Sequence, residues 1–78
     1  MAYYDDLAQK LALDVMQAQK AMDDDQLIQD IANTLEATSS TMHEAFTTAV
    51  RVYTAEKRAR LQLTQKLKAA GFELKSSE

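Results

Sequence analysis

The stretch Met42–Ala70 constrains the fold more than any other part of the chain, because it is the longest segment with helical character throughout. It contains neither Gly nor Pro. Its stripe positions recur every three or four residues, the spacing that places side chains along one side of a helix. They are Met42, Ala45, Phe46, Ala49, Val50, Tyr53, Leu61, Thr64 and Leu67. The sequence therefore predicts a helix over about residues 41–70, which at 1.5 Å per residue is about 45 Å long.

The end of this helix is also predicted by the sequence. Gly71 follows Ala70 and suits the left-handed position that commonly comes after a helix, and Phe72 is placed to contact Leu67 as in a Schellman motif. Lys66 and Lys68 lie in the last turn, where positive charge favours the helix dipole. We expect residues 71–78 to form a short C-terminal tail.

A first helix is predicted over about residues 4–21. Asp5 and Asp6 supply negative charge at its start, and a heptad-like stripe runs along it. Leu13 and Met16 lie beside that stripe and widen the apolar face, so more than one neighbouring helix is expected. The stripe consists of Tyr4, Leu7, Ala8, Leu11, Val15, Ala18 and Met22.

A second helix is predicted over about residues 23–38. With Asp23 as N-cap, Gln26 is its reciprocal partner, and Met22 and Leu27 are spaced for a hydrophobic staple. The alternative, a cation site at Asp23–Asp25, lacks the Gly and the distal Glu of a calcium-binding loop, so we interpret the aspartates as capping residues. Because the connection is short, the first two helices should be antiparallel.

Two interpretations of the junction between the second and third helices remain open. Thr41 and Glu44 match a capping box, which predicts that a new helix begins there. Leu35 and Met42, however, are seven residues apart, so the apolar stripe stays in phase as it would in one fused helix. We favour a break. The predicted fold class is all-α, a helical hairpin or three-helix arrangement with a long C-terminal helix.

The expected core lies where the stripes of all three helices overlap. Replacing one of its large residues by Ala should cost on the order of 2 to 5 kcal/mol. It consists of Leu11, Val15, Ile28, Ile31, Leu35, Phe46 and Val50.

Length and charge both favour self-association. The chain has 78 residues and no Cys, so we expect one domain over residues 1–78 with no disulfide, and small domains of this kind often gain stability by oligomerising. Residues 1–44 contain nine acids and two lysines, a net charge of −7, whereas residues 45–78 contain seven bases and three acids, a net charge of +4. Opposite charge on the two halves favours a hairpin or an antiparallel dimer. We expect a dimeric helical bundle.

The predicted lengths also define a candidate partner surface. A helix of about 30 residues overhangs helices of about 18 and 15 residues, so the apolar side chains of its distal half lack an intrachain neighbour. An uncovered apolar stripe indicates an interaction surface, and a second copy of the chain is the simplest partner. The candidate partner-binding residues are Tyr53, Leu61, Leu63, Leu67 and Phe72.

Residues for catalysis or cofactor binding are almost lacking. His43 is the single His, Gly71 is the single Gly, and no second ligand or nucleophile stands at helical spacing from His43. We therefore predict no enzyme activity, no cofactor, no metal site and no small-molecule substrate. The apolar runs are far shorter than the roughly 20 residues of a membrane-spanning helix, and residues 1–6 carry acids where a secretory signal carries bases. A cytoplasmic protein without a membrane role is expected.

Two classes of function remain. The first is a protein-interaction module: an adaptor, a regulatory subunit, a co-chaperone or an assembly component. The alternative is a nucleic-acid-binding regulator with a basic helix, although the acidic isoelectric point and the lack of a helix-turn-helix pattern favour the first class. The phosphate contacts of that alternative would be Arg51, Lys57, Arg58, Arg60, Lys66 and Lys68.

Overall fold

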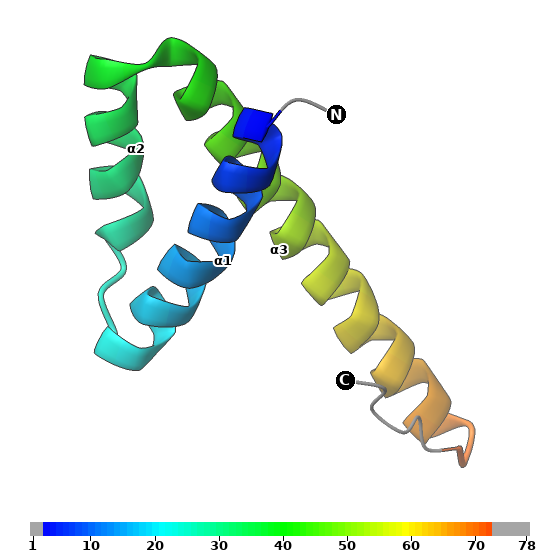
Figure 1. Ribbon diagram of the computed structural model, residues 1–78. Helices are drawn as coiled ribbons and strands as arrows, with labels where there is room; N and C mark the ends of the chain where they lie inside the picture. The colour runs from blue at the N-terminus through cyan, green and yellow to red at the C-terminus, as the bar shows by residue number, and fades with distance from the viewer. Residues whose placement is uncertain (1–2, 73–78) are drawn as a thin grey trace.

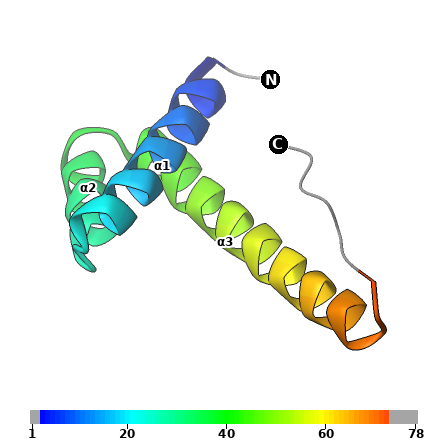
Figure 2. The same cartoon turned by 90° about the horizontal axis from the view of Figure 1, so that it is seen from below.

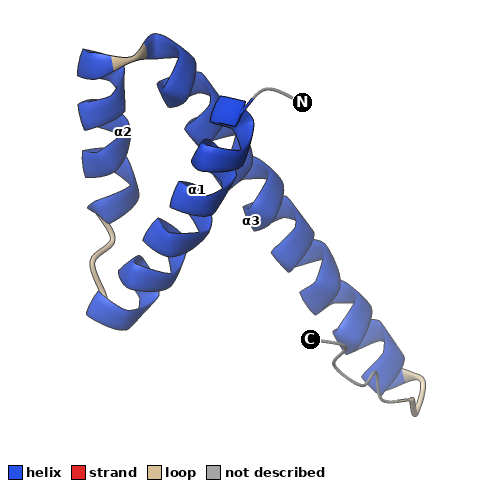
Figure 3. Ribbon diagram, viewed as in Figure 1, coloured by secondary structure: helices blue, strands red, loops and turns tan. Residues whose placement is uncertain are grey.

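A computed structural model describes residues 3–72. Within this range the chain forms three helices and no strand: α1 (Tyr3–Met22), α2 (Leu27–Thr38) and α3 (Ser40–Ala69) (Figure 1; Figure 3). The predicted all-α, three-helix architecture is confirmed. The predicted tail, residues 71–78, lies outside the described residues from residue 73 onward.

The three helices form a splayed arrangement from which half of α3 projects. α1 and α2 run in opposite directions, and α3 crosses α1 before extending well beyond it (Figure 1; Figure 2). Both α1 and α2 pack more extensively against α3 than against each other. The first half of α3 is therefore the common wall of the core, while most of its second half projects beyond α1 and α2.

The turn between α1 and α2 differs from the predicted cap. Asp23 has a positive φ of 54°, which Asp tolerates better than most residues, and it ends α1 instead of starting α2. The amide of Asp24 donates to the carbonyl of Gln19 over 3.1 Å, and the amide of Gln26 donates to the carboxylate of Asp24 over 3.0 Å. The prediction of Asp23 as N-cap is therefore wrong, because the N-cap of α2 is Gln26, three residues later.

A break separates α2 from α3, as favoured from the sequence, but its cap is not the predicted one. Ser39 is extended, with φ −161° and ψ 105°, and its side chain accepts a hydrogen bond from the amide of Met42 over 3.2 Å. Ser39 is thus the N-cap of α3, two residues before the predicted Thr41.

The end of α3 has the predicted Schellman geometry. Gly71 has a φ of 88°, the left-handed region that glycine adopts without strain. The amide of Phe72 donates to the carbonyl of Leu67 over 2.8 Å, and the amide of Gly71 donates to that of Lys68 over 3.1 Å.

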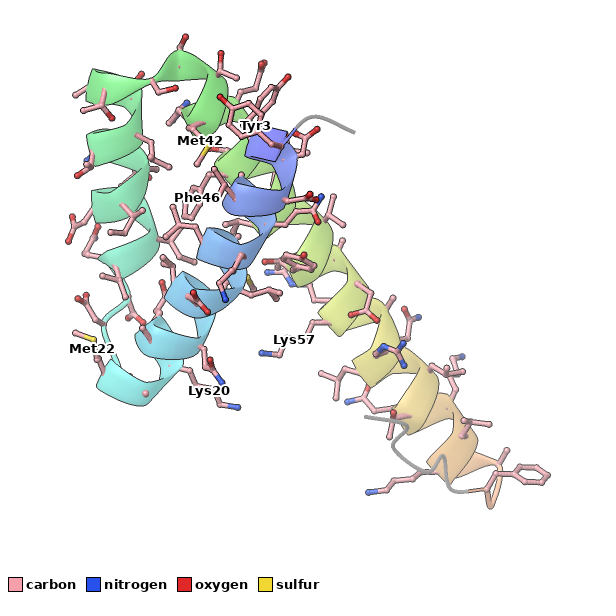
Figure 4. All side chains as sticks on the ribbon, viewed as in Figure 1. Tyr3, Lys20, Met22, Met42, Phe46 and Lys57 are labelled. Atoms are coloured by element: carbon pink, nitrogen blue, oxygen red, sulfur yellow. The ribbon has the colours of Figure 1, made fainter. Side chains whose placement is uncertain are left out.

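The core combines one large aromatic side chain with several alanines. Phe46 is completely buried where the three helices meet (Figure 4), and Val15 is also buried. The other buried residues are Ala8, Ala12, Ala32 and Ala49. Phe46 and Val15 confirm the predicted core, but the five other predicted core residues are only partly buried around the alanines. These are Leu11, Ile28, Ile31, Leu35 and Val50.

The chain is extended for its size. Its radius of gyration is 15.3 Å, whereas a compact domain of this length has a radius of gyration of about 11.5 Å. Its accessible surface is 6280 Å², against about 4700 Å² for a typical monomer of the same mass. The projecting half of α3 accounts for the elongated shape in Figure 1.

Candidate interaction surface

The projecting half of α3, residues 54–69, is the candidate interaction surface, and we name it the distal arm. Every residue of the arm is exposed except Thr54, Thr64 and Leu67, which are half-buried. Figure 2 shows the arm extending away from α1 and α2. The overhang expected from the helix lengths is therefore present.

The candidate partner-binding residues differ in exposure. Tyr53 is half-buried and packs against the core, so it lies at the base of the arm. Leu67 is half-buried, whereas Leu61 and Leu63 are 59% and 48% exposed. Phe72, which follows the arm, is 67% exposed. Four of the five residues thus lie on or just beyond the arm.

These residues do not share one side of the helix. Residues two apart are separated by about 200° around an α-helix, so Leu61 and Leu63 lie on nearly opposite sides. Leu67 is four residues after Leu63 and lies on the same side as Leu63. One partner helix can therefore cover Leu63 and Leu67 together but leaves Leu61 outside.

A different set of positions forms one continuous side of the arm together with Val52 before it and Ala70 after it. These positions recur with alternating spacings of four and three residues, the pattern of a two-helix seam. The large apolar residues of this set are Val52, which is 57% exposed, and Leu63. We name this set the heptad face, and it consists of Val52, Glu56, Ala59, Leu63, Lys66 and Ala70.

The predicted partner-binding residues include only one member of the heptad face, Leu63. Val52 is not among them, because it lies off the stripe that faces the core. The stripe of the core and the heptad face are two different phases of the same helix. The signal that identifies Val52 is a second heptad pattern, separate from the stripe of the core, in the residues that extend beyond α1 and α2.

Charge on the arm is spread around the helix. Arg51 and Arg58 are seven residues apart and share one side, whereas Arg60 lies nearly opposite Arg58. Arg60 also forms an ion pair with Glu56, one turn earlier, and both side chains are more than half exposed. The other predicted phosphate contacts, Lys57, Lys66 and Lys68, are exposed at further angles. The six bases therefore form no single positively charged stripe.

Two open hollows adjoin the crossing of α1 and α3. One, of about 520 Å³, lies beside the base of the heptad face and is lined by residues that include Tyr4, Asp5, Ala49, Val52 and Tyr53. The other, of about 410 Å³, opens between the end of α1 and the start of the arm. Its lining carries charges of both signs, which favours no single class of ligand. Lys20 and Lys57 (Figure 4) line it, together with Asp23, Asp25 and Arg58.

The described residues contain no metal-ligand cluster. Within residues 3–72, no three His, Asp or Glu side chains gather closely enough to hold an ion. His43 is half-buried in the first turns of α3, beside a shallow, open hollow. No helix in the same range combines the length and the hydropathy needed to cross a bilayer.

Comparisons with protein-family models, with curated proteins and with solved structures find no match to this chain.

Proposed function

We propose that this chain is a small, non-enzymatic protein-interaction module that binds an α-helix of its partner along the distal arm. One observation carries the proposal: α3 continues for more than four turns beyond the core and presents exposed apolar side chains there. An apolar stripe on an overhanging helix suits a helix-in-groove or coiled-coil partner.

The surface area supports a partner of ordinary size. The chain exposes about 1500 Å² more than a typical monomer of its mass. One partner in a standard protein–protein interface gives up about 800 Å². The surplus exceeds the area that one partner gives up, so an extended chain of this kind has enough exposed surface for a stable interface.

The proposed roles are those of a module without chemistry of its own: an adaptor, a regulatory subunit, a co-chaperone or an assembly component. We propose the cytoplasm as its location, which agrees with a chain that has no Cys. A dimeric helical bundle is the proposed form of the protein, because self-association covers the arm without requiring a second gene product.

The alternative, nucleic-acid binding through the arm, has less support. The six proposed phosphate contacts, five on the arm and Arg51 before it, are distributed around the helix, and Arg60 is already paired with Glu56. A net charge of −3 also opposes non-specific attraction to a polyanion.

A matched pair of variants tests the proposal. Leu63→Glu places a charge on the heptad face, and Leu61→Glu places the same charge on the opposite side. Affinity capture from extracts of the producing cells should recover a protein, or a second copy of the chain, with wild type and Leu61→Glu but not with Leu63→Glu. Circular dichroism should show that both variants keep their helices. A set of captured proteins that is the same for all three chains would contradict the proposal.

A further inference from the structure

We infer, on the basis of the proposed function, that the partner of the distal arm is a second copy of this chain. The two arms pair antiparallel about a two-fold axis at the level of residue 61, so that Glu56 of each copy pairs with Lys66 of the other. The inference rests on the charges of the heptad face.

The heptad face carries two charged residues of opposite sign, Glu56 and Lys66, ten residues apart. In a parallel, in-register pair each residue faces its own mate, so Glu56 would face Glu56 and Lys66 would face Lys66. In an antiparallel pair with its axis midway between them, each glutamate faces a lysine. Like charges across a helical seam disfavour pairing, and opposite charges favour it.

The register that pairs these charges also pairs the apolar residues of the face. Residues of the heptad face that lie opposite each other in this register have numbers that add to 122, as 56 and 66 do. Ala59 then lies opposite Leu63 of the second copy, and Val52 lies opposite Ala70. A large side chain meets a small one in both layers, which lets the two helices approach closely.

Flanking positions strengthen the same register. Tyr53 and Leu67 occupy the position beside the heptad face on one edge, and the antiparallel arrangement brings Tyr53 near Leu67 of the second copy. Arg60 lies on that edge near the axis and faces its own mate, but each Arg60 is already paired with the Glu56 of its own chain. The one like-charge approach in the interface is therefore partly neutralised.

Neighbouring registers are less favourable. Shifting the second copy by one heptad toward the core places Lys66 against Ala49, which is buried beneath α1, and leaves Glu56 facing Ala59. Shifting the second copy by one heptad in the other direction places Lys66 opposite Leu63. Glu56 then lies opposite a position beyond Ala70 of the second copy. Of the three, only the central register matches both charges and uses positions at or beyond Val52.

The end of each arm also finds a complementary surface. In this register Ala70 of the second copy reaches Val52, which lines the hollow of about 520 Å³. Phe72 follows Ala70 and is 67% exposed, so the hollow can receive it. Asp5 and Glu44 line the same hollow, and they face the lysines of the arriving helix end. The acidic half of one copy thus meets the basic half of the other.

Charge reversal tests the pairing. Glu56→Lys and Lys66→Glu should each weaken homodimers by at least about tenfold, because each converts two attractive pairs into two repulsive ones. An equimolar mixture of the two variants should form heterodimers tighter than the homodimer of either variant, and the double variant should regain homodimers. Recovery should be partial, because Glu56→Lys also removes the intrachain partner of Arg60. Sedimentation equilibrium measures all four samples.

Cysteine cross-linking tests the orientation, since the chain has no Cys of its own. Val52→Cys mixed with Ala70→Cys should give a disulfide-linked heterodimer on oxidation, and neither variant alone should cross-link efficiently. Efficient cross-linking of each variant with itself would overturn the antiparallel arrangement.

The outcomes separate this inference from the proposed function. If the charge-reversed mixture associates no better than either variant, the register is wrong. If wild type is monomeric while Leu63→Glu abolishes capture of a different protein, the dimer is wrong and the interaction module stands. If no partner of any kind distinguishes Leu63→Glu from Leu61→Glu, the interaction module itself is wrong.

Discussion

Leu61 and Leu63 lie on nearly opposite sides of α3, although a single residue separates them. Both are exposed, at 59% and 48%, and both belong to the projecting half of the helix. One partner helix can cover Leu63 and leave Leu61 in water. The two leucines are therefore a matched pair, because they have the same chemistry, similar exposure and different predicted roles.

The first prediction uses this pair on the purified protein. Leu63→Glu should raise the dissociation constant of the dimer by at least about a hundredfold, since burial of each leucine contributes roughly 1.5 to 3 kcal/mol and the dimer contains two. Leu61→Glu should change it by less than about threefold. Analytical ultracentrifugation measures both constants. Equal weakening by the two variants would contradict the assignment of the heptad face.

The second prediction concerns the core. Phe46→Ala should lower the free energy of unfolding by about 3 to 5 kcal/mol, because Phe46 is completely buried where the helices meet. Leu13→Ala is the control, since Leu13 is half exposed on α1 and should cost less than about 1 kcal/mol. Urea denaturation followed by circular dichroism gives both values. A Phe46→Ala variant with wild-type stability would show that the packing around Phe46 is wrong.

The third prediction concerns the start of α3. Ser39→Ala should cost about 1 kcal/mol, because the Ser39 side chain accepts a hydrogen bond from the amide of Met42. Ser40→Ala, at the next position, removes an exposed hydroxyl and should stay within about 0.5 kcal/mol of wild type. Equal losses in the two variants would place the cap elsewhere.

The fourth prediction separates the two classes of function. Neither duplex nor single-stranded DNA should bind at physiological salt, since the basic residues of the arm surround the helix and the chain is acidic overall. Fluorescence anisotropy with labelled oligonucleotides measures this. A micromolar complex that weakens steeply with salt and is lost in an Arg58→Ala, Arg60→Ala double variant would favour the nucleic-acid alternative.

The fold class and the helix order were predictable from the sequence, but two of the caps were not. Asp23 and Thr41 both had the sequence pattern of an N-cap, yet a left-handed Asp23 ends α1 and Ser39 starts α3. Several Asp, Ser and Thr residues stand at each junction, and each can accept the hydrogen bond of a free amide. Tertiary packing selects one of them, which local pattern alone cannot do. Gly71 was predictable because no other residue near it suits a positive φ.

The core was predicted by position but not by residue size. Seven large apolar residues were predicted to form the core, and two of them, Phe46 and Val15, are buried. The other buried residues at the crossing of α1 and α3 are Ala8, Ala12 and Ala49. A close crossing buries small side chains completely and leaves larger neighbours at its margin. Sequence periodicity shows which side of a helix faces inward, but it does not show where two helices approach most closely.

The sequence predicted how much of α3 is free to bind a partner, but not which side of the helix binds it. Helix lengths were sufficient to predict the overhang. Helix periodicity alone separates Leu61 from Leu63, because residues two apart lie on nearly opposite sides of a helix. Adding Val52 required knowledge of where α1 leaves α3, because the side of α3 that faces away from the core becomes relevant only beyond that point.

The measurement that tests the account most directly is the mass of the wild-type chain in solution. Sedimentation equilibrium at about 100 μM should give a mass of twice the 8.7 kDa of one chain. The dimer should dissociate only weakly as salt is raised, since apolar contacts flank the two ion pairs. A mass of 8.7 kDa at that concentration would contradict the pairing of two arms.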